Sequence, residues 1–264
     1  MGKRLDKKRF DFNKLLAPMV LFGLIIFFSI FGNNFFSLDY LINVLDASYF
    51  IGFMAIGVTF VIITGGIDLS LGTNMMCAAL IGGYAYNAWH WPMGYCLVLV
   101  ITFATLLGLI NGIMVAYLNL PPFIATLGMM MMGMGFGSIA TNVQTMRYPT
   151  FGTKEGFFKN LFYKTTSGFP IGALWLVGFF VVAHVILNNT RFGRYTFAIG
   201  SNKEAARLSG IKIRPWFAAV YTFCGFCSGF AGVFYAAVYT SIIPQTGNGL
   251  ELLGIAGVVI GGPV

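Results

Sequence analysis

Residues 93–118 read MGYCLVLVITFATLLGLINGIMVAYL. They lie inside a longer segment, Leu69 to Met146, that contains no Asp, Glu, Lys or Arg. Because about 20 mostly apolar residues are enough for a helix to cross a bilayer, this segment holds several crossings. Two breaks divide it: Trp89-His90-Trp91-Pro92, which is typical of an aromatic belt at a membrane surface, and Asn119-Leu120-Pro121-Pro122. The segment therefore predicts a helical membrane protein.

The composition of the whole chain supports the same class. Of the 264 residues, 58% are hydrophobic and only 9% are charged, whereas a soluble domain carries about 25% charged residues. A water-soluble enzyme is excluded because too little polar surface is available to cover it. The hydrophobicity also excludes intrinsic disorder, and four cysteines are too few for a disulfide scaffold. We predict an all-α, polytopic transmembrane helix bundle.

Reading the gaps between charged residues gives about seven spans in a single transmembrane domain that covers residues 1–264. The predicted spans are residues 15–33, 47–66, 71–88, 94–118, 123–143, 171–187 and 216–240. After the last span, Leu252 to Val264 is apolar and rich in glycine, but it is too short to cross a bilayer. We therefore expect a partial C-terminal element after the seven spans.

The basic residues predict the orientation, because Lys and Arg in short loops stay on the cytoplasmic side. Twelve of the 16 basic residues precede the first span or lie between the sixth and seventh. Six crossings separate these two clusters, so both lie on one side. Residues 1–14 and 188–215 are then cytoplasmic, whereas 144–170 form an external loop with four basic residues that an external partner would explain. Topology and anionic membrane lipid account for the basic clusters, so no nucleic-acid binding is expected.

Few residues offer catalytic or metal-binding chemistry. Cys224 and Cys227 have CxxC spacing, but their neighbours are Phe, Gly, Ser and Ala, so buried packing is the better interpretation. Ser228 and His184 do not have the spacing of an intramembrane serine protease. The chain contains no GxxxxGK[ST] phosphate loop, so any ATP hydrolysis belongs to another subunit. We expect no enzyme activity, no catalytic residue, no metal and no cofactor in this chain.

The sequence GGIDLSLG at residues 65–72 follows the second predicted span. An isolated Asp deep in the bilayer would cost about 3 kcal/mol, so Asp68 should face protein, water or free backbone amides. Gly65 and Gly66 can break the helix, after which Asp68 or Ser70 can cap the next one. Asp68 is then either only a cap, or part of a broken helix that shapes a translocation path. The candidate residues of this segment are Gly65, Gly66, Asp68, Leu69, Ser70 and Gly72.

The predicted cytoplasmic loop 188–215 contains GSNKEAARLSG at residues 200–210. Asn202 can cap a short helix that Gly210 ends in a left-handed conformation. Small residues at its centre favour a surface that another protein approaches closely, over a solvated charged linker. The candidate docking residues are Asn202, Glu204, Ala205, Ala206 and Gly210. A second acidic residue, Glu251, stands alone in an apolar context and is a further intramembrane candidate.

Four segments together resemble the permease subunits of bacterial ATP-binding-cassette (ABC) importers of the ribose, xylose and galactose type. They are GGIDLSLG at 65–72, GLINGIMVAYLNLPPFIATLG at 108–128, NTRFGRYTFAIGSNKEAARLSGI at 189–211 and GIAGVVIGG at 254–262. The resemblance implies a bacterial cytoplasmic (inner) membrane protein that imports a monosaccharide.

The resemblance also implies partners: a second, identical or different permease subunit, an ABC ATPase subunit and an external sugar-binding protein. The helix with Asn202, Glu204, Ala205, Ala206 and Gly210 would be the element that couples to the ATPase, and the segment at 65–72 would line or support the pore. Because the binding protein supplies selectivity, no deep sugar site is expected in this chain.

The sequence departs from the family pattern in two places. Glu251 is followed by Leu252 and Leu253, where the family commonly has ELDAIA. Family members also continue past the glycines that correspond to Gly261 and Gly262, so the resemblance implies a C-terminal truncation. There are three alternatives to a sugar-importer permease. One is an importer of the same kind for another small polar solute, such as a nucleoside or a signalling furanose derivative. The other two are a secondary transporter or channel and a non-functional permease fragment.

Overall fold

The computed structural model describes residues 12–32, 35 and 37–262. The predicted cytoplasmic N-terminus, residues 1–14, lies almost entirely outside these residues. The chain forms two units, one that ends at Val44 and one that comprises Leu45–Val264. The description below concerns the larger unit unless α1 is named.

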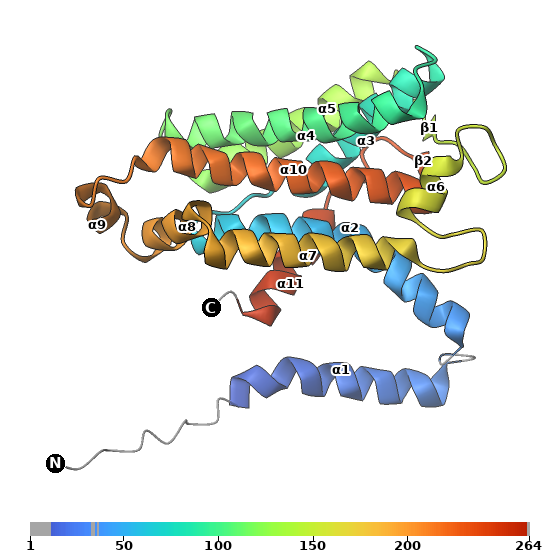
Figure 1. The fold of residues 1–264 in the computed structure, drawn as a ribbon, viewed down its shortest axis with the longest axis horizontal. Coiled ribbons are helices and arrows are strands. Elements are labelled where there is room, and N and C mark those ends of the chain that lie inside the picture. Colours follow the sequence, from blue (N-terminus) through green and yellow to red (C-terminus); the bar gives the residue numbers. More distant parts are fainter. Residues whose placement is uncertain (1–11, 33–34, 36, 263–264) are drawn as a thin grey trace. The chain divides into compact units, whose positions relative to one another are not determined.

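The described residues are almost entirely helical (Figure 1). The elements, in chain order, are α1 (Phe12–Phe31), α2 (Leu38–Ile63), α3 (Leu71–Asn87), α4 (Met93–Ala116), α5 (Pro122–Ala140), β1 (Met146–Arg147), α6 (Phe157–Phe162), α7 (Ile171–Asn189), α8 (Arg191–Ser201), α9 (Lys203–Leu208), α10 (Ile213–Tyr239), β2 (Ser241–Ile242) and α11 (Leu250–Gly261).

Each predicted span overlaps one of the long helices α1 to α5, α7 and α10. Among the described residues, five helices are long and apolar enough to cross a membrane, namely α2, α4, α5, α7 and α10. Helix α3 has only 17 residues, and the described apolar part of α1 is Met19–Phe31. A polytopic helical bundle is confirmed, with five spans identified by length and composition.

Helix α2 begins at Leu38 and not near residue 47, so the predicted start of the second span was wrong. The prediction started the span after Asp46, because the gap without charged residues begins at Ala47. In the structure Asp46 is only 3% exposed, and Lys164 neutralises it with an N–O distance of 2.6 Å. Tyr163 donates a second hydrogen bond to Asp46 at 3.2 Å. Helix α2 therefore continues past Asp46, because Lys164 from a distant loop neutralises its carboxylate.

The most extensive helix contact joins α4 and α10, which run side by side (Figure 1). A Cβ atom placed on Gly225 would lie 2.8 Å from the Cα of Gly108, and one on Gly229 would lie 2.7 Å from the Cα of Ile101. Only glycine allows backbones to approach this closely. Gly225 and Gly229, spaced as a GxxxG motif, thus pack two spans together.

The external loop predicted at 144–170 is folded and pairs with the chain after α10. Strand β1 pairs antiparallel with β2, Met146 opposite Ile242. The ammonium of Lys159 is buried and donates to the Oγ1 of Thr240 at 2.6 Å. Two of the four basic residues in the loop 144–170, Lys159 and Lys164, therefore have interaction partners within the chain.

These two lysines differ in their electrostatic environment. Burial lowers the pKa of Lys159. Burial alone would also lower the pKa of Lys164, but the hydrogen bonds and charge interactions with Asp46 and Tyr163 outweigh it, so the pKa of Lys164 is raised. Lys164 therefore stays charged where Asp46 needs a counter-ion.

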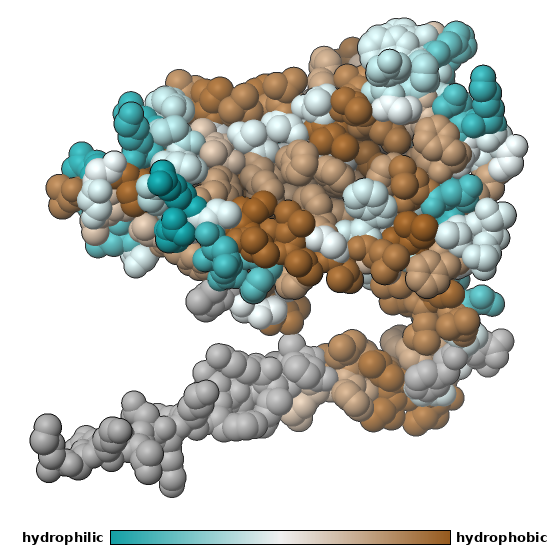
Figure 2. Space-filling model, viewed as in Figure 1, coloured by the Kyte–Doolittle hydropathy of each residue, from teal (hydrophilic) through white to brown (hydrophobic). Residues whose placement is uncertain are grey.

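Hydrophilic residues gather at the two ends of the long helices, and hydrophobic residues cover the surface between them (Figure 2). One end carries α6 and the β1–β2 pair. The other carries α8 and α9, where Gly200 of α8 lies against the carbonyl of Ile63 at the end of α2. The predicted loop 188–215 thus contains two helices where the sequence predicted one, because α8 was not recognised before the Asn202 cap.

Candidate functional site

The GGIDLS segment is a break between α2 and α3. Helix α2 ends at Ile63, and Gly65 adopts a φ of +76°, which favours glycine. A Cβ on Gly66 would lie 2.6 Å from the hydroxyl of Tyr221 on α10, and that hydroxyl donates to the carbonyl of Ile67 at 3.3 Å. The predicted helix break is confirmed, and α10 supports it.

Asp68 and Ser70 are buried in this break, but they do not form the predicted cap. The Oδ1 atom of Asp68 accepts from the backbone N–H of Ser70 at 2.9 Å and from its hydroxyl at 2.7 Å. Ser70 occupies the N-cap position of α3, but its side chain accepts no capping hydrogen bond from a backbone N–H of the helix. The hydroxyl of Ser70 is instead donated to Asp68, so Asp68 braces the turn that precedes the helix.

Two asparagines that the sequence analysis missed complete this network. Asn74 of α3 and Asn111 of α4 both donate from Nδ2 to the Oγ of Ser70, at 2.7 and 2.8 Å. Both side chains are buried, and the Oδ1 atom of each has no partner among the described residues. The sequence did contain a signal for these two residues. A carboxamide inside an apolar span needs a polar partner, as a charge does, but only charged residues were considered as candidates.

Glu251 and Gly72, which the sequence placed in separate features, meet in the structure. Glu251 is buried in the first turn of α11, and its Oε1 accepts from the N–H of Gly249 at 3.0 Å. A Cβ on Gly72 would lie 2.7 Å from the Oε2 of Glu251 and 2.5 Å from the carbonyl oxygen of Gly247. Glycine at position 72 therefore lets the start of α11 approach α3.

The predicted docking helix is α9. Asn202 is its N-cap and accepts from the N–H of Ala205 at 3.0 Å, and Gly210 follows with a φ of +83°. Glu204 and Arg207 form an exposed ion pair at 2.8 Å. The cap, the helix and the glycine stop agree with the prediction.

The two central alanines of α9 face opposite ways. Ala205 is exposed, but Ala206 is buried against the chain itself and does not contribute to an outer surface. The most exposed apolar side chain of α9 is Leu208, at 83%. The sequence analysis missed Leu208 because it treated this residue only as the end of the helix.

Gly200 of α8, the helix before α9, lies beside the end of α2, where the break begins. A Cβ on Gly200 would lie 1.8 Å from the carbonyl oxygen of Ile63, two residues before Gly65. Three of the four segments quoted for the family resemblance thus reach this region: 65–72 forms it, 108–128 supplies Asn111, and 189–211 supplies Gly200. The fourth segment begins at Gly254, one turn after Glu251 in α11. The site is a structural junction built around a broken helix.

Ser228 and His184, the serine and histidine compared above with a protease pair, have different environments in the structure. Ser228 is buried and donates to the carbonyl of Leu71 at 2.8 Å, whereas His184 is on an exposed face of α7. Cys224 and Cys227 are free thiols buried in α10. Within the described part of the chain, no group of three or more His, Cys, Asp or Glu side chains could hold a metal ion.

Comparison with known proteins identifies the family. The model of the branched-chain amino acid transport system / permease component family matches residues 40–263. The ribose import permease protein of Escherichia coli (strain K12) is 35% identical over 94% of this chain and 76% of its own length. The fructose import permease protein of Rhizobium meliloti is 30% identical over 94% of this chain and 68% of its own.

The autoinducer 2 import system permease protein of Yersinia pseudotuberculosis (strain YPIII) is 33% identical, again over 94% of this chain and 68% of its own length. A search of solved structures gave no match. The family model covers most of the chain and agrees with the bundle of apolar helices. The chain therefore belongs to the branched-chain amino acid transport system / permease component family, and it is a multi-pass membrane permease of an import system.

Proposed function

We propose that this chain is the membrane-spanning subunit of an ABC importer that carries a monosaccharide delivered by an external binding protein. The names of the ribose and fructose import permeases support a sugar substrate. A second permease subunit would complete the translocation path. ATP would be hydrolysed by a separate ATPase subunit, since this chain has no phosphate-binding loop.

The proposed topology has seven spans in the bacterial inner membrane, with residues 1–14 and 188–215 in the cytoplasm and 144–170 outside. The contacts within the larger unit agree with it. Asp46, Lys164 and the β1–β2 pair lie at one end, and Gly200 lies beside Ile63 at the other. Two residues in contact at the same end of the bundle lie on the same side of the membrane, so an even number of spans must separate them. The seven-span order gives an even number for each of these pairs.

The observation that carries the proposal is the way α9 is presented. Its inner face is anchored by Ala206, its first turn is capped by Asn202, and Leu208 projects outward with Ala205 and the Glu204–Arg207 pair. A short, rigid helix with an exposed apolar tip fits a groove on a partner. We propose that this partner is the ATPase.

Movement of α9 would reach the break through α8. The backbone of Gly200 packs directly against the carbonyl of Ile63, so α8 cannot move toward or across the end of α2 without displacing it. Closure of the ATPase would therefore move the end of α2 as a rigid body. Asp68 and Ser70 are buried, so in this proposal the GGIDLS segment supports the path, and selectivity belongs to the binding protein.

A second candidate function is import of a different small polar solute by the same architecture. The autoinducer 2 import system permease supports it, since its identity to this chain is comparable to that of the sugar permeases. The two candidates share every element argued above. Binding assays on the external binding protein that works with this chain would separate them.

The decisive experiment replaces Leu208 with Glu. We expect the variant to insert in the membrane and unfold at the same temperature as the wild type, because Leu208 makes almost no contact within the chain. Co-purification of the ATPase and uptake of radiolabelled ribose should both be lost. Leu161→Glu is the control for ATPase co-purification, because Leu161 is also an exposed leucine, at 45%, and lies in α6, which the proposed topology places on the opposite side of the membrane from the ATPase.

Normal uptake by Leu208→Glu would refute docking through α9. Uptake that continues after ATP depletion, with the ion gradient intact, would refute the ABC importer and favour a secondary transporter or channel. Loss of uptake with unchanged ATPase binding would place the function of α9 at a step after docking.

A further inference from the structure

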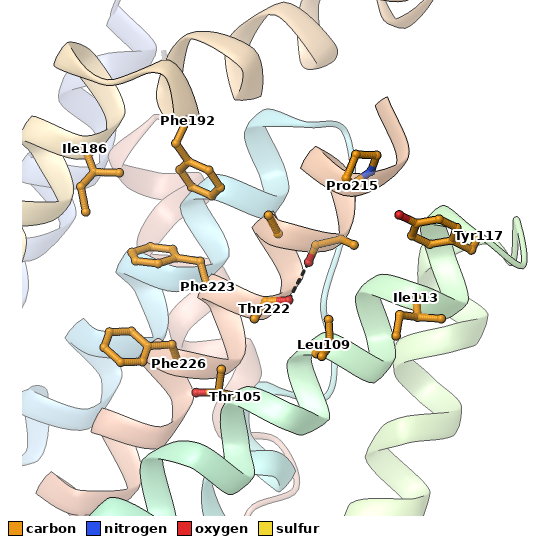
Figure 3. A pocket seen from close by; sticks show the side chains of 12 residues that line it. Thr105, Leu109, Ile113, Tyr117, Ile186, Phe192, Pro215, Thr222, Phe223 and Phe226 are labelled. Carbon is orange, nitrogen blue, oxygen red and sulfur yellow. Dashed lines mark hydrogen bonds between the residues drawn. The ribbon is translucent and has the colours of Figure 1, made fainter. Parts of the chain in front are cut away.

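Two adjoining cavities on the larger unit have opposite character. The first, of about 1020 Å³, is an apolar groove between α4, α7, α8 and α10 (Figure 3). The second, of about 780 Å³, lies at the end of α4 beside α9 and the start of α10. Tyr117 and Pro215 line both cavities, so the groove and the second chamber adjoin.

The second chamber is basic. Its charged lining consists of Lys203, Glu204, Arg207, Lys212 and Arg214. The single carboxylate, Glu204, is already paired with Arg207, whereas Lys203, Lys212 and Arg214 form no ion pair among the described residues. The uncapped N-terminus of the 27-residue helix α10 lies at the same place and adds its positive dipole end. The chamber is therefore complementary to an anion.

The depth of the groove matches one leaflet of a bilayer. It extends along α4 from Tyr117 to Thr105, which at a rise of about 1.5 Å per residue is about 18 Å. Half of a hydrocarbon core about 30 Å thick is about 15 Å. Because α4 ends at Ala116 and α10 begins at Ile213, the basic chamber lies at the membrane surface and the groove runs inward from it.

We propose that these cavities together bind one anionic phospholipid, with the phosphate headgroup in the basic chamber and an acyl chain along the groove. A helix from another protein would favour a groove through the whole membrane, whereas this groove stops near the bilayer centre. The charge at one end and the apolar lining below it match an amphiphile. This proposal does not depend on the transported solute or on the ATPase.

The test uses phosphatidylglycerol that carries a photoactivatable diazirine in the middle of an acyl chain. The protein is reconstituted in nanodiscs of phosphatidylcholine with one quarter phosphatidylglycerol, irradiated, and the labelled peptides are identified by mass spectrometry. We expect label on the groove residues of α4 and α10. Unlabelled phosphatidylglycerol should compete, and phosphatidylcholine should not.

Two charge variants separate a specific site from general attraction to the surface. The double variant Lys212→Gln/Arg214→Gln should label about tenfold less, since it removes cations that would hydrogen-bond the bound phosphate, and one hydrogen bond to a charged group is worth about that factor. Arg191→Gln/Arg194→Gln is the control, because it removes the same charge from exposed positions on α8 that do not line the chamber. Its labelling should stay within about twofold of the wild type.

A third variant tests the groove itself. Ala219→Trp fills the groove without removing a charge, so it should reduce acyl labelling, and its thermal unfolding is measured to confirm that it folds. Equal labelling of both double variants, or equal competition by phosphatidylcholine, would show bulk lipid contact and overturn the proposal. Cross-links between two copies through α4 and α10 would do the same, because the groove would then be a protein interface.

Discussion

Replacing Gly200 with Ala tests the contact between α8 and α2. The added Cβ atom would lie 1.8 Å from the carbonyl oxygen of Ile63, whereas ordinary contact begins at 3.4 Å. The two helices would have to separate by about 1.6 Å at this point. Because the obstacle is backbone, no side-chain rotation can relieve it, and overpacking of this kind costs about 1–3 kcal/mol.

The intrinsic effect of the substitution has the opposite sign. Alanine in a helix is favoured over glycine by about 1 kcal/mol. Gly178→Ala in α7 isolates that gain, since nothing lies within 4 Å of a Cβ at position 178. Gly200→Ala should therefore unfold at a lower temperature than the wild type in detergent micelles, and Gly178→Ala at the same or a higher one.

Uptake should follow the same order if α8 transmits movement to the helix break. Gly200→Ala should lose most transport even at temperatures where it remains folded and still binds the ATPase. A Gly200→Ala protein as stable and as active as Gly178→Ala would refute the contact and the coupling route that depends on it.

Four further results follow from the structure. Lys164→Gln leaves Asp46 buried without a counter-ion and should cost about 3–5 kcal/mol, and the double variant Asp46→Asn/Lys164→Gln should recover most of it in thermal unfolding measurements. Because the pKa of Lys164 is raised, its ion pair is fully stabilising below the ordinary lysine value of 10.5. This stability is lost as pH rises from 10.5 through the raised pKa, so over that range the wild-type unfolding temperature should fall more steeply than that of the double variant. Ser70→Ala removes the acceptor of two buried carboxamides and should cost about 1–3 kcal/mol for each, measured in the same way. Asn202→Ala should cost about 1 kcal/mol of helix stability and weaken co-purification of the ATPase, and Asn202→Asp should retain both.

The sequence was informative wherever one local rule decides the structure. Charge-free segments located all the long helices, Gly65-Gly66 located the break, and Asn202 with Gly210 located the ends of α9. Each of these depends on hydrophobicity or backbone freedom within a few neighbouring residues. Such features can be read without knowing what lies across the fold.

The sequence failed where a distant partner decides the outcome. The start of α2 depends on Lys164, the burial of Ala206 depends on how α9 rests on the chain, and the role of Ser70 depends on Asn111 of α4. The closeness of Gly72 to Glu251 is of the same kind. Long-range pairings of this sort set which residue of a motif faces inward, and no local pattern records them.

The ion pair of Asp46 also has a consequence for synthesis of the chain. Tyr163 precedes Lys164 in the chain and also donates a hydrogen bond to Asp46. It follows Asp46 by 117 residues. At about 5–20 residues per second, the carboxylate leaves the ribosome about 6–23 s before its partners exist. During that interval the first turns of α2 carry an unneutralised charge, which holds them at the water interface. We therefore expect the first turns of α2 to reach their final position only after Lys164 has been synthesised.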